Sequence, residues 1–185
     1  MERIFLIGPP GAGKTACGQT LAERLQCEFF DTDRLIETAQ GCSVSEIFAK
    51  HGESRFRQLE RALLEQMRDQ RDQQGEVTVF ATGGGLPVYN NNIELLQELG
   101  KVVALSAEVS VLVERVKTTG ARPLLALSGD DADKELQKRI SDLLTERSPV
   151  YARAGYKIDT SGLSPEQVAN EIVGILYGKR ASPLT

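Results

Sequence analysis

A glycine-rich segment between an apolar run and a helix-forming run constrains this chain more than any other feature. Residues 8–15 read Gly-Pro-Pro-Gly-Ala-Gly-Lys-Thr, after the apolar residues 4–7 and before the helix-forming residues 16–25. Glycines let backbone N–H groups converge on one concavity, and the positive end of the following helix attracts phosphate groups. All four fixed positions of the Walker A pattern match, so phosphate binding is favoured over a simple glycine turn.

The end of this segment supplies the side chains that a nucleotide needs. Lys14 can reach the β- and γ-phosphates as a compact charge, and the Thr15 hydroxyl can ligate Mg²⁺. We expect Lys14 to be an exposed side chain outside the core. The pattern predicts Mg²⁺ as the cofactor and ATP contacts at Gly11, Ala12, Gly13, Lys14, Thr15 and Ala16.

Length and composition predict one soluble domain. The chain has 185 residues, of which 41% are apolar and 26% charged, as is typical of globular proteins. No stretch approaches the roughly 20 apolar residues of a membrane span, and the N-terminus enters a strand without a signal or transit segment. We therefore expect a single domain over residues 1–177, a tail at 178–185, a cytoplasmic location and no membrane partner.

Charge and cysteine spacing argue against several other partners. The net charge is −4 without a basic stripe, which argues against a nucleic-acid partner. The three cysteines lack CxxC spacing, so neither a disulfide framework nor a zinc site is suggested. We expect a monomer whose cationic site is local.

Strand-forming and helix-forming segments alternate along the chain. Short apolar or β-rich runs predict strands over residues 4–7, 27–30, 77–81, 102–105 and 155–159. Helical periodicity predicts helices over residues 16–25, 33–39, 43–50, 53–73, 90–98, 108–117, 133–147 and 165–177. The alternation is typical of a three-layer α/β fold, in which helices cover both faces of a parallel sheet of about five strands. Residues 118–133 break the periodicity, and we expect a mobile flap there.

Two local signals divide the helical residues 43–73. Ser43 and Glu46 have the spacing of a capping box, and Gly52 predicts the end of the first of the two helices. The lone His51 is most simply a helix-end charge. In that case the protein has no histidine base.

Two aspartates follow the second predicted strand. Asp31 stands at its carboxyl end, where α/β sheets bind ligands, whereas the third strand ends without an acidic residue. Asp31 is therefore a candidate Mg²⁺ ligand, although it could instead cap the next helix. Asp33 could accept a proton from a substrate hydroxyl or cap that helix, and the sequence leaves both interpretations open.

Charged and glycine residues farther along are candidates for a second ligand site. Arg57 and Glu60 lie three residues apart on one helix face, and as a surface pair they would contribute only about 0.2–0.5 kcal/mol. The three glycines at 83–85 permit close approach to a ligand, or form a flexible turn. Arg122 in the flap could act as an arginine finger or be a solvated charge. Arg147 ends a helix, where a cation also complements the helix dipole.

Together these stretches resemble the shikimate kinase family, small P-loop kinases related in fold to the nucleoside monophosphate kinases. The resemblance rests on residues 8–15, 31–33, 56–60, 83–85, 122–125 and 147–151, in the family's order. It covers all of the chain except the tail. It implies transfer of the ATP γ-phosphoryl group to the 3-hydroxyl of shikimate, giving shikimate 3-phosphate and ADP in the chorismate and aromatic amino acid pathway.

The resemblance also implies a role for each candidate. Asp31 would hold Mg²⁺ through water, Arg115 would stack on adenine, and Arg122 would come down with a lid at about 115–133. The glycines would close around the ring, and the base-clamping segment would lie near 160–161. The implied catalytic residues are Lys14, Asp33 and Arg122. The implied shikimate contacts are Asp33 at the reacting hydroxyl, Arg57 and Arg147 at the carboxylate, Glu60 behind Arg57, and Gly83, Gly84 and Gly85.

Two alternatives remain. A related small-molecule kinase, for gluconate or a nucleoside monophosphate, would share the loop but not the carboxylate-binding set of Arg57, 83–85 and Arg147. A P-loop switch or regulatory ATP-binding module would lack turnover. Residues 159–162 match a GTPase DxxG pattern, but they lie near the chain's end and no NKxD motif follows, which disfavours this class.

Overall fold

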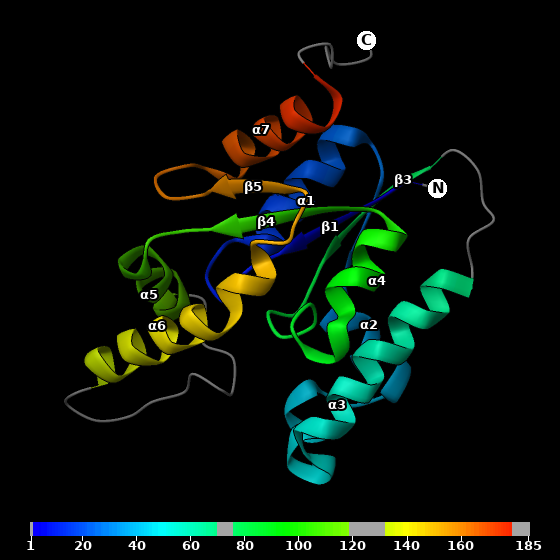
Figure 1. The fold of residues 1–185 in the computed structure, drawn as a ribbon, viewed down its shortest axis with the longest axis vertical. Coiled ribbons are helices and arrows are strands. Elements are labelled where there is room, and N and C mark those ends of the chain that lie inside the picture. The colour runs from blue at the N-terminus through cyan, green and yellow to red at the C-terminus, as the bar shows by residue number, and fades with distance from the viewer. Residues whose placement is uncertain (1, 70–75, 119–131, 179–185) are drawn as a thin grey trace.

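A five-stranded sheet with helices on both faces forms the body of the protein (Figure 1). The computed structural model describes residues 2–69, 76–118 and 132–178. The strands are β1 (Glu2–Ile7), β2 (Glu28–Asp31), β3 (Val77–Ala81), β4 (Lys101–Ser106) and β5 (Tyr156–Asp159). They are parallel and lie in the order β2-β3-β1-β4-β5. The predicted three-layer α/β fold is confirmed.

The described helices alternate with these strands along the chain. They are α1 (Lys14–Leu25), α2 (Thr32–Gln40), α3 (Val44–Asp69), α4 (Asn92–Leu99), α5 (Val109–Thr118), α6 (Ala132–Tyr151) and α7 (Pro165–Tyr177). A short 3-10 helix, η1 (Tyr89–Asn91), precedes α4. Each parallel pairing requires a crossover, and the helices supply it.

Alternating side chains of the central strand divide the core into two layers. Ile4 and Leu6 belong to the cluster that packs against α1, α5, α6 and α7. Phe5 and Ile7 point to the other face and pack with residues of α3 and α4. All four are fully buried. Strand residues that are buried on both faces read as a continuous apolar run, which is why the segment was recognisable in the sequence.

The predicted division of residues 43–73 is confirmed at both signals. Glu46 N–H donates to Ser43 Oγ at 3.2 Å and Ser43 N–H donates to Glu46 Oε2 at 2.9 Å, which completes the capping box. The two helices run together as α3, but Gly52 has φ 75° and ψ 173°, so the helical backbone is interrupted there. The predicted helical residues 70–73 lie outside the described part of the chain.

The predicted end of the helix at Arg147 is wrong, because α6 continues through Pro149 to Tyr151. Proline removes one N–H donor and crowds the preceding turn of a helix, but Pro149 lies only two residues before the end of α6. The Tyr151 side chain is buried, and its hydroxyl donates to Gly84 O at 2.7 Å. This contact stabilises the last turn and ties α6 to the glycine segment after β3.

The loop after β1, the end of β2 and the segment after β3 meet at the carboxyl edge of the sheet. Residues 8–13 follow β1, Asp31 ends β2 and residues 82–88 follow β3. Because β2, β3 and β1 are neighbours, these three segments lie side by side.

Two predictions fall largely outside the described residues. The predicted lid at about 115–133 contributes only its first and last residues, at the end of α5 and the start of α6. Of the predicted tail only Gly178 is described, after the end of α7. In the described ranges, no helix combines the length and the apolar character needed to cross a membrane.

Candidate active site

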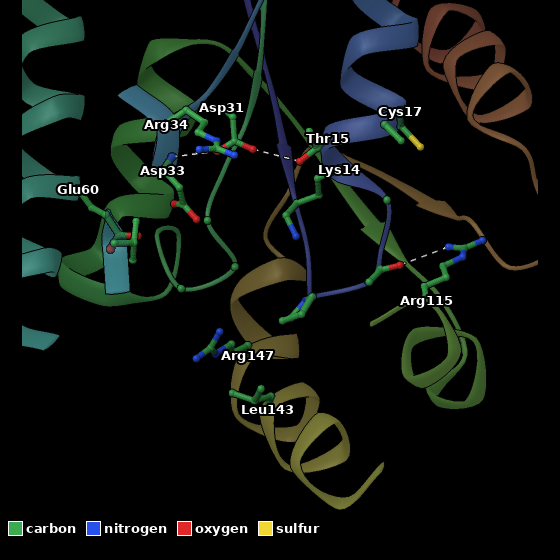
Figure 2. A pocket seen from close by; sticks show the side chains of 18 of the residues that line it. Lys14, Thr15, Cys17, Asp31, Asp33, Arg34, Glu60, Arg115, Leu143 and Arg147 are labelled. Atoms are coloured by element: carbon green, nitrogen blue, oxygen red, sulfur yellow. Dashed lines mark hydrogen bonds between the residues drawn. The ribbon is translucent and has the colours of Figure 1, made fainter. Parts of the chain in front are cut away.

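An open cleft of about 1490 Å³ lies at this carboxyl edge (Figure 2). The loop after β1, the start of α2, the first half of α3, the glycine segment after β3, and α5 and α6 all contribute to its walls. The predicted site residues that line it are Gly11, Gly13, Lys14, Thr15, Ala16, Asp31, Asp33, Arg57, Glu60, Gly83, Gly84, Gly85, Arg115 and Arg147. Ala12 is fully buried in the same loop, and Arg122 lies outside the described residues.

The loop after β1 turns directly into α1. Gly13 has a left-handed backbone with φ 87°, a conformation that glycine adopts without strain, and Lys14 begins the helix. Lys14 Nζ donates to the carbonyl oxygens of Gly8 and Pro9, each at 2.8 Å. Only 5% of Lys14 is exposed, so the expected exposed lysine is wrong. The side chain is covered because its ammonium group folds back under the loop, where carbonyl oxygens are the nearest acceptors.

A hydroxyl and a carboxylate meet on the wall next to the loop. Thr15 Oγ1 donates to Asp31 Oδ2 at 3.1 Å, and the other Asp31 oxygen accepts the backbone N–H of Asp33 at 3.0 Å. Asp31 therefore caps α2 with one oxygen and faces Thr15 with the other, so the two interpretations of Asp31 are compatible. Asp33 does not cap α2, since it lies in the first turn of that helix.

The pair of Thr15 and Asp31 fits a Mg²⁺ ion. Mg²⁺ favours oxygen ligands, and in kinase sites it is bound by one or two protein groups together with substrate phosphates and water. Both oxygens line the cleft beside the glycine loop. The donor set therefore matches what a nucleotide-bound Mg²⁺ requires.

The glycine segment, residues 83–85, lies close to the charged side chains of Asp33, Glu60 and Arg57. Gly83 N–H donates to Thr32 Oγ1 at 3.1 Å. A Cβ atom at Gly83 would lie 2.5 Å from Asp33 Oδ1 and 3.3 Å from Glu60 Oε1. A Cβ at Gly85 would lie 2.6 Å from Arg57 Nη1. A side chain at either glycine would therefore force the Asp33 carboxylate or the Arg57 guanidinium group to move.

Arg57 and Glu60 form a buried ion pair, so the expectation of a surface pair is wrong. Arg57 Nη1 donates to Glu60 Oε2 at 2.8 Å. Arg57 is 7% exposed and Glu60 is 0% exposed, because the glycine segment and Tyr89 cover them. Loss of one partner from a buried pair is costly, since the other charge is left uncompensated.

Burial shifts the titration of Glu60. Removal from water raises the pKa of Glu60 to about 7, with Arg57 lowering it and Asp33 raising it further. Glu60 Oε1 is buried and has no hydrogen-bond partner among the described residues. The carboxyl group therefore changes its protonation near neutral pH, next to the arginine that it orients.

Two residues of this wall, Glu53 and Tyr89, were missed in the sequence. Glu53 Oε1 accepts hydrogen bonds from Arg57 Nε at 3.1 Å and from Arg57 Nη2 at 2.7 Å. The Tyr89 ring lies 4.1 Å from the Arg57 guanidinium carbon, a cation–π contact. The spacing of Glu53 and Arg57, four residues apart in a helix, could have revealed the first contact. The contact between Arg57 and Tyr89 joins α3 to η1, which are far apart in the sequence, so no local sequence pattern predicts it.

Arg147 reaches the same cleft from α6 (Figure 2). It is 7% exposed, and its buried Nε has no hydrogen-bond partner among the described residues. A Cβ at Gly84 would lie 3.7 Å from Arg147 Nη1. Gly84 is itself tied to α6 by the Tyr151 hydroxyl. Arg147 is therefore more than a helix-end charge, because its guanidinium group is buried beside the glycine segment.

Arg115 joins α5 to the glycine loop and to the end of β5. Its Nη1 donates to Thr160 Oγ1 at 2.9 Å and its Nη2 donates to Thr160 O at 2.8 Å. A longer contact of 3.5 Å runs from Arg115 Nη1 to Gly11 O. The structure thus brings together Arg115, the loop and the segment at 160–161; the family resemblance implies that Arg115 and this segment lie beside adenine. His51 is exposed, and it is not among the residues that line the cleft.

Comparison with known proteins gives one family. The shikimate kinase family model matches residues 10–177. The shikimate kinase of Thermodesulfovibrio yellowstonii is 40% identical over 173 residues, which cover 94% of each chain. That of Pelotomaculum thermopropionicum is 42% identical over 176 residues, covering 95% of this chain and 96% of the relative.

A solved structure agrees with these relatives. The shikimate kinase from Acinetobacter baumannii, in complex with shikimate, superimposes with a TM-score of 0.84 at 33% identity, covering 98% of this chain and 96% of the other. The fold, the cleft at the carboxyl edge and the sequence relatives all lead to one conclusion. The chain belongs to the shikimate kinase family, the ATP-dependent phosphotransferases that act on shikimate in the route to chorismate and the aromatic amino acids.

Proposed function

We propose that this cleft holds ATP over residues 8–15 and shikimate between α3, the glycine segment and α6, and transfers the γ-phosphoryl group to the 3-hydroxyl. The observation that carries the proposal is the burial of two guanidinium groups, Arg57 and Arg147, on the walls of one cleft. Guanidinium groups match a planar carboxylate with paired, charge-assisted hydrogen bonds. The acceptor then carries a carboxylate, as shikimate does and a nucleoside monophosphate does not.

The nucleotide half of the site is assigned to the loop and its neighbours. The backbone N–H groups of the loop and the start of α1 would receive the phosphates, and Lys14 would exchange its carbonyl acceptors for phosphate oxygens. Arg115, held against Thr160 and Gly11, would border the adenine. Its position across the loop from Asp31 supports this division of the cleft (Figure 2).

Thr15 and Asp31 are proposed to hold Mg²⁺, Thr15 directly and Asp31 through water. When bound, the ion would neutralise charge that develops on the phosphates during transfer. The support is the 3.1 Å separation of Thr15 Oγ1 and Asp31 Oδ2 beside the loop. Asp31 remains anchored meanwhile, because its other oxygen caps α2.

Asp33 is proposed to accept a hydrogen bond from the 3-hydroxyl and so to direct its oxygen toward the γ-phosphate. In Figure 2 the Asp33 side chain lies between Lys14, on the phosphate side, and Glu60, on the acceptor side. Transfer then depends mainly on positioning and charge neutralisation. Arg122 stays a prediction from its sequence motif, as the residue that would stabilise the transferring group.

We also propose that the enzyme works as a monomer in the cytoplasm, where ATP is available. The support for a monomer is that one chain supplies the loop, both acidic residues and both guanidinium groups of the cleft.

The acceptor assignment is tested with ADP release over shikimate, gluconate, AMP and CMP, in wild type and in Arg57→Ala and Arg147→Ala. Each removal should cost roughly 1.5–3 kcal/mol, the range for hydrogen bonds to charged groups. That corresponds to about tenfold to a hundredfold in kcat/KM for shikimate, with little change in the KM for ATP. Arg55→Ala, an exposed position on the same helix, is the matched control and should behave as wild type.

An analogue with a neutral hydroxymethyl group in place of the carboxylate sharpens this test. It should be a poor acceptor for wild type and should lose little more with Arg57→Ala. If the arginine variants discriminate between acid and analogue as strongly as wild type does, the carboxylate is bound elsewhere. Preference for gluconate or a nucleotide over shikimate would contradict the acceptor assignment outright.

A further inference from the structure

One edge of the Arg57 guanidinium group is already occupied by a carboxylate of the same chain. Arg57 Nε and Nη2 both donate to Glu53 Oε1, at 3.1 and 2.7 Å. Two N–H groups on one edge are the arrangement with which arginine grips a carboxylate. Glu53 therefore fills the edge of Arg57 that is best suited to an acceptor's carboxylate.

Arg57 is held in place independently of Glu53. Its Nη1 donates to the fully buried Glu60 at 2.8 Å, and its guanidinium carbon lies 4.1 Å from the centre of the Tyr89 ring. The backbone of Gly85 closes over the same group, because a Cβ there would lie 2.6 to 2.8 Å from three of its atoms. The guanidinium group is thus fixed by Glu60, Tyr89 and Gly85, and loss of Glu53 would leave it in position.

Glu53, in contrast, is the more exposed of the two acidic partners of Arg57. Its side chain is 45% exposed, whereas that of Glu60 is 0% exposed. It follows Gly52, where the helical backbone is interrupted, and it lines the cleft. Hydrogen bonds from Arg57 lower the pKa of the Glu53 carboxyl, with smaller contributions from Tyr89 and Arg147, so it is an anion at neutral pH. A carboxylate of this kind can exchange contacts with Arg57 for contacts with water.

We propose that Glu53 is an internal stand-in for the acceptor's carboxylate, which the acceptor must displace from Arg57 in order to bind. The proposal rests on the proposed function, because it takes Arg57 as the carboxylate contact. An anionic acceptor can displace Glu53, because it replaces one charged pair with another, whereas a neutral acceptor has no charge to offer Arg57 and binds with the Glu53 contact still closed. The displacement lowers the affinity for an anionic acceptor, since only molecules with the Glu53 contact open can bind it.

The expected change in the Kd of shikimate follows from the fraction of enzyme molecules in which Glu53 contacts Arg57. If Glu53 occupies Arg57 in about 80–90% of empty molecules, the apparent Kd of the acceptor is raised about five- to tenfold. Glu53→Gln keeps the size of the side chain and removes its charge. We therefore expect Glu53→Gln to lower the Kd of shikimate, measured by titration calorimetry without nucleotide, about five- to tenfold, with the Kd of the neutral hydroxymethyl analogue unchanged.

The chain contains a closely matched control. Glu65 on the same helix accepts from Arg61 at 2.8 Å with the same four-residue spacing, and its side chain is 44% exposed. It is not among the residues that line the cleft. Glu65→Gln removes an equivalent pair and should leave the Kd of shikimate as in wild type. In an Arg57→Ala background, Glu53→Gln should also have no effect, because the contact that it releases is already gone.

The outcomes separate this proposal from the assignment on which it rests. Unchanged or weaker binding of shikimate by Glu53→Gln overturns the stand-in role. Equal tightening of shikimate and of the neutral analogue also overturns it, because Glu53 would then only narrow the cleft. If Arg57→Ala alone weakens binding as expected, the acceptor assignment survives that result. If Arg57→Ala binds shikimate as tightly as wild type, the assignment of Arg57 falls and the stand-in role falls with it.

Discussion

Thr15 and Asp31 lie sixteen positions apart in the chain, and the Thr15 hydroxyl donates to an Asp31 carboxylate oxygen at 3.1 Å. The contact joins the first turn of α1 to the end of β2, across the carboxyl edge of the sheet. Asp33, only two residues farther along, faces a different part of the cleft, near Gly83 and Glu60. The two aspartates thus face different parts of the cleft.

Asp31→Asn and Asp33→Asn should therefore fail in different ways. Asp31→Asn should raise the Mg²⁺ concentration for half-maximal rate by about tenfold or more, the usual range for loss of an outer metal partner. Asp33→Asn should leave ATP affinity intact and lower kcat by about 10²–10⁴, as expected for loss of a group at the reacting hydroxyl. Titration of Mg²⁺ and of ATP in both variants measures this. Indistinguishable defects would contradict the division.

Lys14→Ala should abolish turnover and also weaken the fold. Lys14 Nζ donates to Gly8 O and Pro9 O, and the side chain is buried. The substitution should lower kcat by at least about a hundredfold and the free energy of unfolding by roughly 1–3 kcal/mol, because charged hydrogen bonds inside the loop are lost. ADP release and urea denaturation report the two effects. Lys157→Ala, exposed on β5, is the control, and near-normal turnover of Lys14→Ala would refute the phosphate assignment.

Glu60 should give the protein a pH-dependent stability. Its folded pKa, about 7, lies above the ordinary glutamate value of 4.5, so between these values the folded state binds more protons than the unfolded state. Stability linked to Glu60 is therefore fully present below about pH 4.5 and is lost as the pH rises through 7. The stability of wild type relative to Glu60→Gln should fall by on the order of 1–3 kcal/mol between pH 5 and pH 8. Urea denaturation across this range measures it; a difference independent of pH would show that Glu60 keeps an ordinary pKa.

Tyr151→Phe should loosen the glycine segment. The Tyr151 hydroxyl donates to Gly84 O at 2.7 Å, and its removal leaves that carbonyl without its side-chain donor. We expect the free energy of unfolding to fall by about 1–3 kcal/mol and the KM for shikimate to rise, because Gly84 lies beside Arg147. Denaturant unfolding and steady-state kinetics give both values. Tyr156→Phe, on β5 and outside the cleft lining, should change neither, and equal behaviour of the two variants would remove the role of this contact.

Much of this protein was readable from local sequence. Residues 8–15 match all four fixed positions of the Walker A pattern, and they lie at the junction of β1 and α1, as the sequence predicts. The alternation of apolar runs with helical periodicity predicts a parallel α/β sheet, and the strand at 77–81 and the helix at 165–177 have the predicted bounds. These features depend on backbone conformation and on residues close together in the chain.

The site's electrostatics, in contrast, required tertiary structure. The spacing of Arg57 and Glu60 predicts their pairing, but the glycine segment and Tyr89, from residues 83–89, decide that the pair is buried. The predicted exposure of Lys14 and the predicted end of α6 are wrong for the same reason. Lys14 donates to carbonyl oxygens of the loop, and Tyr151, at the end of α6, donates to the carbonyl oxygen of Gly84. Burial, and with it the pKa of Glu60, depends on which distant segments cover a charge, and periodicity along one helix carries no information about that.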